Sequence, residues 1–216
     1  MIARHTEAMM QELKSRPDKD ARREAILDVA SRIFLEEGFD ATSMSAIAAK
    51  LGGSKGTLYN YFKSKEELFE AFVDRHCAIH ARLIDSFEVE GGGYREALRR
   101  WARQYLRIVT SDSTMRNYRV IMAVSERWPD IGRAFYENGP LRGARNVANF
   151  LAEAAHAGEF VIDDTLRAAH QFIALCQSRY QKARFLNYLP EPDEAEIAAE
   201  VEAAVDTFYS AYGRRS

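Results

Sequence analysis

The chain lacks the features that mark secreted, disulfide-stabilised and membrane-spanning proteins. It has only two cysteines, Cys77 and Cys176, which lie far apart within apolar patterns. We therefore expect no disulfide framework and predict a cytoplasmic location. No apolar run approaches the ~20 residues that a membrane helix needs, so no membrane partner is expected. The start of the chain has no apolar block before a small-residue cleavage site, as a signal peptide would have.

Proline is also scarce, and the alternating pattern of β-strands is missing. The prolines stand at positions 17, 129, 140, 190 and 192, and segments with a 3.6-residue apolar period fill the spaces between them. No repeat of fixed period is present, which argues against a solenoid. The pattern therefore predicts an all-α protein.

The chain as a whole has no excess of positive charge. Its formal net charge is −2 and its pI is about 6.2, so a uniformly basic nucleic-acid coat is excluded. Residues 42–65 differ, because they contain four lysines and no acidic residue. This local charge predicts a contact with DNA. The alternative is a small helical subdomain whose lysines only keep it soluble.

The sequence before this basic stretch predicts an arm followed by a helix. Residues 1–18, with Pro17 near their end, are expected to form a flexible arm, either a frayed terminus or a segment that reaches a DNA groove. A helix should then run from Asp18 or Asp20 to Glu37, because apolar residues recur at helical spacing from Ile26 to Phe34. Gly38 is expected to cap its end.

Two short helices follow, separated by glycines. Ser43 is the expected N-cap of the first and Ser54 of the second, since serine favours that position. Gly52 and Gly53 between them permit a sharp reversal of the chain. Leu58 should lie on the buried side of the second helix. A helix, a short glycine turn and a second helix form the arrangement that places the second helix in a major groove.

A recurring set of residues spans the two short helices and the start of the next one: Thr42, Ile47, Ala48, Gly52, Leu58, Tyr59, Tyr61, Phe62, Lys65 and Leu68. With these residues in this register, residues 22–69 resemble the N-terminal domain of TetR/AcrR-type transcriptional regulators. One position departs from the family pattern: Gly53 stands where the family usually carries a valine packed into the small core. Without that side chain we expect a looser turn.

The resemblance implies an all-α fold with a three-helix, helix-turn-helix DNA-binding domain at residues 19–64. Residues 65–216 would form a larger helical bundle for ligand binding and dimerisation. Asn60 and Thr57 are the expected base contacts, since an amide can pair with adenine and threonine can touch a thymine methyl. The positions carried over as DNA contacts are Thr42, Ser54, Lys55, Gly56, Thr57, Tyr59, Asn60, Tyr61 and Lys65.

Residues 122–140 further resemble the AefR-like subset of regulatory domains, which implies a pocket for a small, largely apolar effector. Aromatic and thioether side chains in a helical bundle are suited to such a pocket, although they are also ordinary core residues. The expected lining residues are Trp101, Tyr105, Met115, Tyr118, Met122, Trp128, Phe172 and Cys176.

The last two helices, near 164–183 and 194–212, carry wide apolar stripes. These stripes either cover their own domain or pair with a second copy, as the family resemblance implies. Two recognition helices need half-sites ~34–36 Å apart, which gives dimerisation a geometric motive. The residues expected in the homodimer interface are Leu166, Ile173, Tyr180, Ile197, Val201, Val205, Phe208 and Tyr212.

A helix over 65–88, closed by the glycines at 91–93, should connect the two domains. His76 and His80 stand four residues apart on it, a spacing seen in zinc sites. We expect two ordinary polar histidines and no metal.

The sequence therefore predicts a homodimeric regulator that binds double-stranded operator DNA, most simply a repressor released by its effector. An activator of the same family is one alternative. A helical interaction module that uses its basic face for protein contact is another. The third is an all-helical enzyme with a site within residues 94–180. We expect neither enzyme activity nor a cofactor, because no catalytic triad, phosphate loop or metal cluster can be assembled from the motifs.

Overall fold

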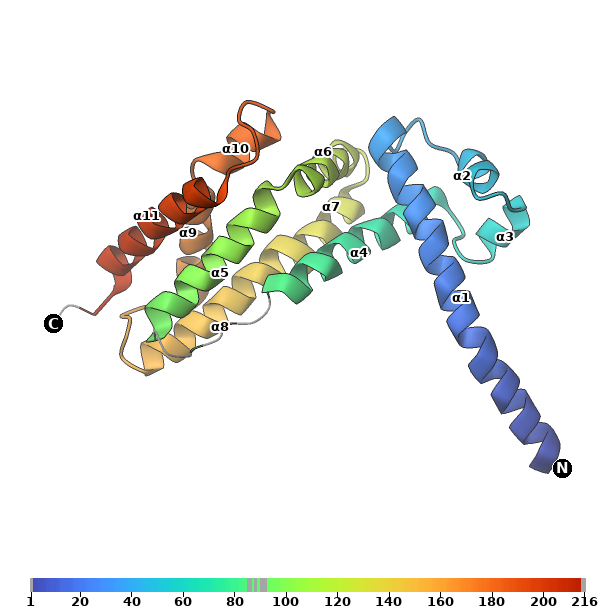
Figure 1. The fold of residues 1–216 in the computed structure, drawn as a ribbon, viewed down its shortest axis with the longest axis horizontal. Coiled ribbons are helices and arrows are strands. Elements are labelled where there is room, and N and C mark those ends of the chain that lie inside the picture. The colour runs from blue at the N-terminus through green and yellow to red at the C-terminus, as the bar shows by residue number, and fades with distance from the viewer. Residues whose placement is uncertain (1, 85–86, 88, 90–92, 215–216) are drawn as a thin grey trace. The chain divides into compact units, whose positions relative to one another are not determined.

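The protein was examined as a computed structural model, which describes residues 2–84, 87, 89 and 93–214 (Figure 1). The described secondary structure is helical apart from an isolated antiparallel bridge between Phe160 and Gly213. No described helix is long and apolar enough to cross a membrane. The helices are α1 (Ile2–Glu37), α2 (Met44–Lys50), α3 (Lys55–Tyr59), α4 (Lys65–Ile84), α5 (Gly93–Thr110), α6 (Asp112–Ser125), α7 (Pro129–Tyr136), the π-helical η1 (Glu137–Leu141), α8 (Arg142–His156), α9 (Thr165–Gln177), α10 (Tyr180–Phe185) and α11 (Glu194–Tyr212).

The chain divides into two compact units, residues 1–73 and 74–216. Helix α4 belongs to both, because the division falls between Val73 and Asp74. The expected boundary at residue 65 instead placed all of this helix in the second domain.

The first unit is built around a cluster of phenylalanine rings. Phe34 from α1 lies 5.0 Å from Phe69 of α4, and Phe39 lies 4.9 Å from the same ring, both edge-on. This geometry is the favourable one for aromatic pairs. Gly38 has φ +81°, so the chain can leave α1 in a left-handed conformation and return Phe39 to the core.

The core of the second unit lies between α5, α8, α9 and α11. Its side chains follow the helical period expected from the sequence, because one face of each helix is apolar. Two signals at helix starts are also present: Asp164 caps α9, and Asp193 with Glu196 forms a capping box at α11. The largest core members include Trp101, Phe150, Phe172 and Phe208.

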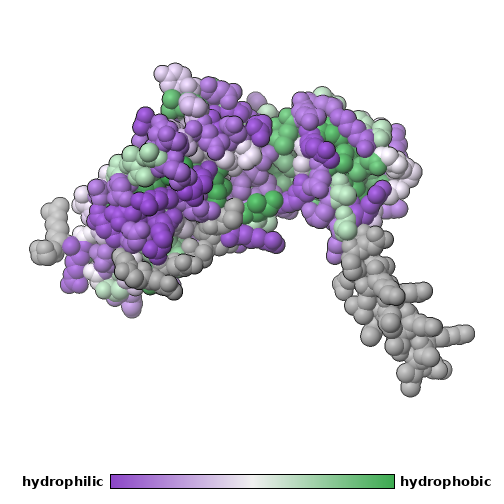
Figure 2. All heavy atoms as spheres, viewed as in Figure 1, coloured by the Kyte–Doolittle hydropathy of each residue, from purple (hydrophilic) through white to green (hydrophobic). Residues whose placement is uncertain are grey.

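The outer side of α5 is held to α11 by ion pairs. Arg99 Nε lies 2.7 Å from Glu202, and Arg107 contacts Glu194 at 2.7 Å. Arg95 pairs with Asp206. Figure 2 shows this surface as a hydrophilic area over α5 and α11. Because these groups are largely exposed, they set the register of the helices more than they stabilise the fold.

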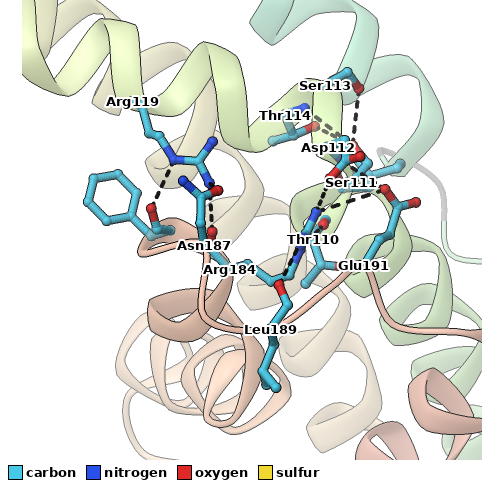
Figure 3. A network of polar contacts seen from close by, with 12 residues as sticks. Thr110, Ser111, Asp112, Ser113, Thr114, Arg119, Arg184, Asn187, Leu189 and Glu191 are labelled. Atoms are coloured by element: carbon cyan, nitrogen blue, oxygen red, sulfur yellow. Dashed lines mark hydrogen bonds and ion pairs between the residues drawn. The ribbon is translucent and has the colours of Figure 1, made fainter.

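A buried arginine fastens α10 and the segment after it to the turn between α5 and α6 (Figure 3). Arg184 is 5% exposed. It donates to the carbonyl oxygens of Thr110 at 2.9 Å and Leu189 at 3.0 Å, and it pairs with Asp112 at 2.5 Å. Arg119 of α6 donates to the carbonyl of Phe185 at 2.9 Å. These bonds hold α10 in a fixed position against α6, since a buried guanidinium needs its acceptors.

Two element boundaries differ from expectation. Helix α1 begins at Ile2, not at Asp18 or Asp20, and passes through Pro17. The residues before Pro17 are mostly strong helix formers, and proline costs one N–H there, so the helix extends in both directions. Helix α9 ends at Gln177, and α10 begins separately at Tyr180. Of the expected glycine joint, residues 91 and 92 lie outside the described part of the chain.

Candidate DNA-binding surface and ligand cavity

Helices α2 and α3 form the predicted helix-turn-helix, and serines cap both. Ser43 Oγ accepts from the N–H of Ala46 at 3.1 Å, and Ser54 Oγ accepts from the N–H of Thr57 at 3.2 Å. These bonds satisfy backbone donors that each helix start leaves unpaired. Gly52 has φ +67°, a conformation that suits glycine in the turn between them.

Two apolar side chains anchor α3 and leave its other side exposed. Leu58 and Phe62 are each 1% exposed. Lys55, Gly56, Tyr59 and Asn60 are exposed, while Ser54 is exposed as the N-cap and Thr57 and Tyr61 are half-buried. The polar residues expected to meet DNA therefore lie at the surface, with two exceptions.

Thr42 and Lys65 are the exceptions, because both are engaged inside the first unit. Thr42 is 3% exposed, and its hydroxyl donates to the carbonyl of Gly38 at 2.6 Å. The ammonium of Lys65 donates to the carbonyl oxygens of Phe39 at 2.7 Å and Thr42 at 3.0 Å. It also lies 4.1 Å from the centroid of the Phe39 ring. These contacts hold the α1–α2 loop, so we remove both residues from the expected DNA contacts.

The charge of the basic stretch is also smaller than the lysine count suggests. Lys50 pairs with Glu37 at 2.8 Å, and this pair raises the pKa of Lys50 through its hydrogen bond. Lys65 is engaged as described. Lys55 and Lys63 are exposed, and their ammonium groups have no ion pair among the described residues. These two lysines are thus the ones best placed for phosphate.

The position of Gly53 does not match the expectation of a missing core side chain. A Cβ built there would meet the guanidinium of Arg22 at 3.5 Å, an ordinary contact distance. Gly53 is not one of the described glycines with a positive φ, so its backbone does not require glycine. A Cβ is therefore tolerated at this position beside α1.

The second unit encloses a cavity of about 560 Å³. Ligand pockets usually measure ~300–1,000 Å³. Its walls come from α4, the end of α5, α6, α7, η1, the start of α8, α9 and α10. Tyr118 lies within it, with its ring edge-on to Phe135 at 5.2 Å and to Phe185 at 6.0 Å. Such aromatic walls favour flat apolar ligands.

Polar side chains on α4 form one wall of the cavity. The rings of His76 and His80 lie 4.1 Å apart. His76 Nδ1 is 2.7 Å from the side-chain nitrogen of Asn117, and His80 Nε2 is 3.4 Å from the hydroxyl of Thr114. Burial, and to a lesser degree the charge of His80, lowers the pKa of His76 to about 3. Burial also lowers the pKa of His80.

The same pKa shifts bear on the possible zinc site. Both histidines are neutral at pH 7 and could act as ligands, but a structural zinc site needs four. No group of three or more histidine, cysteine or acidic side chains converges in the part of the chain that the structure describes. The sequence signal for this cavity wall was the histidine pair itself.

The cavity is also closely packed against α4 at η1. Asn138 donates to Asp74 at 3.0 Å, and a Cβ added to Gly139 would lie 3.3 Å from the sulfur of Cys77. Burial raises the pKa of the Cys77 thiol to about 11, with a further increase from Asp74. A thiol in this state is a packing group and a poor nucleophile.

Two family models match the chain. Residues 26–72 match the bacterial regulatory proteins of the tetR family, and residues 96–214 match the AefR-like transcriptional repressor C-terminal domain. The chain belongs to the TetR family of transcriptional regulators. Its members are regulators and not enzymes.

Solved structures of TetR-family regulators cover nearly the whole chain. The flavonoid-responsive regulator FrrA is 36% identical, with TM-score 0.82, over 91% of this chain and 100% of its own. A TetR-family regulator from Mesorhizobium loti is 27% identical, with TM-score 0.81, over 90% and 98%. Among curated relatives, the repressor NemR of Escherichia coli is 27% identical over 63% of this chain and 68% of its own length. The activator FasR of Mycolicibacterium smegmatis is 38% identical over 39% of this chain, which corresponds to only 34% of its length.

Four of the eight expected pocket residues of this TetR-family chain line the cavity: Tyr105, Met115, Tyr118 and Met122. The other four do not. Trp101, Phe172 and Cys176 are buried in the core between helices, and Trp128 is 37% exposed beyond the end of α6. Helical period identifies residues that share a face, but it does not separate a cavity wall from a packed core.

The expected dimer stripe is mostly wrong. Tyr180 is buried within its own chain, as are four of the five α11 residues, so these side chains cannot meet a second copy. Tyr212 is half-buried and bonds to Gln171, and the half-buried Ile173 lies on the cavity wall. Leu166, at 38% exposure, is the most exposed of the eight. The residues of α11 that are at most 2% exposed are Ile197, Val201, Val205 and Phe208.

Proposed function

We propose that this TetR-family regulator is a homodimeric repressor whose DNA affinity falls when a flat, largely apolar ligand fills the cavity of the second unit. The observation that carries the proposal is the wall formed by α4. His76, Cys77 and His80 line the cavity, and the same helix continues into the DNA-binding unit as residues 65–73. A ligand that favours one position of α4 would therefore couple the two activities, reciprocally.

The DNA contacts proposed for this function come from α3 and its flanks. Lys55 and Lys63 would bind phosphates, because they are exposed cations without an ion pair among the described residues. Gly56 and Tyr59 lie on the same exposed side. Asn60 follows the last residue of α3, and recognition helices read bases mainly with their N-terminal residues. We therefore assign Asn60 a contact at the edge of each half-site.

The ligand class is supported by the cavity lining and by one relative. The lining includes the thioethers of Met115 and Met122 and the ring of Tyr118, which packs edge-on against Phe135. FrrA is described as flavonoid-responsive, and flavonoids are flat polycyclic aromatics. A ligand of this shape suits a cavity of about 560 Å³.

We place the dimer interface on the outward faces of α9 and α11. Ala199, Ala203 and Thr207 follow one another at four-residue intervals on the exposed side of α11. Small side chains let two helices approach closely. Leu166 of α9 and Val161, which is 67% exposed, are exposed apolar residues that we include in this interface.

The dimer assignment can be tested with one pair of variants. Ala203→Arg places a charge on the proposed face, and Ala123→Arg places the same charge on an exposed position of α6. Light scattering should give a monomer for the first and a dimer for the second. A dimeric Ala203→Arg protein would refute this interface, and a monomeric wild type would refute the dimer itself.

The regulatory function needs DNA and ligand in one experiment. The full chain should select palindromic duplexes from a random library, with an affinity that falls steeply with salt. Adding a flavanone should weaken binding to the selected duplex at least 10-fold. A flavanone that binds without changing DNA affinity would exclude an effector role for that compound class. Transcription that rises with protein and falls when the operator is removed would identify an activator, the function for which FasR is named.

A further inference from the structure

The charged side chains of the cavity are all of one sign. Arg142 at the start of α8 and Lys182 on α10 both line it. None of the described lining residues is aspartate or glutamate, although the whole chain has 32 acidic residues against 30 Lys and Arg. A cavity lined by one sign of charge favours ligands of the opposite sign.

Both cations that line the cavity are exposed, and so are three of its apolar lining residues. Arg142 and Lys182 are exposed. Met122, Tyr136 and Leu186 line the cavity and are 48%, 50% and 73% exposed. The exposed part of the lining thus includes both apolar surface and positive charge, which matches a ligand with an apolar body and a charged end.

The interior of the cavity offers hydrogen bonds without additional fixed charge. His76 and His80 are neutral at pH 7 because burial lowers their pKa values. The positive charge of Arg142 also acts at the cavity wall, since it counteracts part of the rise in the pKa of Cys77, which burial and Asp74 cause. Arg142 and Lys182 are thus the charged side chains that line the cavity, while Asp74, which acts on Cys77, is not a lining residue.

We propose that the effector is an aromatic anion, whose ring system lies among Tyr118, Phe135 and Phe185 and whose anionic oxygen is bound by the exposed lining residues Arg142 and Lys182. This inference rests on the proposed function, because it assumes that the cavity binds the effector. It excludes neutral hydrocarbons and cations as the preferred ligands. Carboxylates and phenolates share the required chemistry.

Two dyes with one skeleton test the charge directly. N-phenyl-1-naphthylamine is neutral, and 8-anilinonaphthalene-1-sulfonate carries a sulfonate on the same ring system; both fluoresce in apolar sites. The neutral dye is the more apolar of the two, so an uncharged cavity would bind it more tightly. We expect the sulfonate to displace the neutral dye and to bind at least 5-fold more tightly in low salt.

The variants Lys182→Met and Arg142→Met should each weaken sulfonate binding about 5-fold to 10-fold, and leave binding of the neutral dye within 2-fold. Arg145→Met is the matched control, because Arg145 is exposed on the same helix α8 and does not line the cavity. It should change neither affinity. Adding 0.5 M salt should weaken sulfonate binding selectively.

The outcomes separate this inference from the function on which it rests. Binding of the neutral dye with equal or weaker binding of the sulfonate, or unchanged sulfonate affinity in both variants, overturns the anion proposal alone. Failure of both dyes to bind overturns the ligand cavity and the anion proposal together. A carboxylate and a phenolate of one flavone, titrated against the bound neutral dye, then show which anionic group the site prefers.

Discussion

Replacing Lys65 by alanine should destabilise the DNA-binding unit without removing a phosphate contact. The ammonium group has two carbonyl acceptors, on Phe39 and Thr42, and lies over the Phe39 ring. Lys55 is the appropriate comparison, because it belongs to the same basic stretch and is exposed. Lys65→Ala should therefore lower thermal stability, whereas Lys55→Ala should change DNA binding.

The magnitude follows from the contacts that alanine removes. A hydrogen bond from a charged donor stabilises a fold by about 1.5–3 kcal/mol, and an exposed cation–π contact by about 0.5–1 kcal/mol. Because Lys65 is half-buried and water can replace part of these contacts, we expect a loss of about 2 kcal/mol in the free energy of unfolding. For a chain of this length, that corresponds to a decrease in Tm of about 4–8 °C.

In DNA binding the order of the two variants should be reversed, with Lys55→Ala affected and Lys65→Ala not. Below the unfolding transition, Lys65→Ala should leave the slope of log Kd against log salt unchanged. Lys55→Ala should lower that slope by about one for each DNA-binding head, while Tm stays within about 1 °C. Thermal melts by circular dichroism and fluorescence anisotropy at four salt concentrations provide both quantities. A reduced slope for Lys65→Ala at unchanged Tm would refute the assignment.

Three further outcomes are expected. Gly53→Val should raise Tm by about 1–3 °C, because the new side chain restricts the unfolded chain without strain; a lower Tm would show that the turn needs glycine. Gly139→Ala should alter operator affinity several-fold in the ligand-free protein, since its Cβ presses on Cys77 of α4, and adding Cys77→Ala should reverse the effect; Gly143→Ala, with nothing within 4 Å of its new Cβ, is the control and should match wild type. The free energy of unfolding should fall by about 2 kcal/mol between pH 7.5 and pH 5, because the unfolded state protonates His76 near pH 6.5 and the folded state only near pH 3. The variant His76→Asn should lose most of this pH dependence, as measured by urea unfolding.

The local features of the fold could be predicted from neighbouring residues. Ser43 and Ser54 cap helices as expected, and Asp164 and the Asp193–Glu196 pair cap α9 and α11 by the same local chemistry. A cap depends on residues within one helical turn, so its signal is contained in the sequence. The start of α1 was predicted wrongly because the rule that proline interrupts a helix was applied at Pro17. The residues on both sides of Pro17 favour helix, and α1 continues through it.

The sequence by itself determined that the chain is all-helical, where the helix-turn-helix lies and to which family the chain belongs, because these depend on periodicity and short-range motifs. Only the tertiary structure decided what each surface contacts. Lys65 bonds to residues 23 and 26 positions away, and the apolar stripe of α11 packs against its own subunit and not against a second copy. Periodicity shows which side chains share a face, whereas the partner of that face is chosen by contacts between segments far apart in the chain.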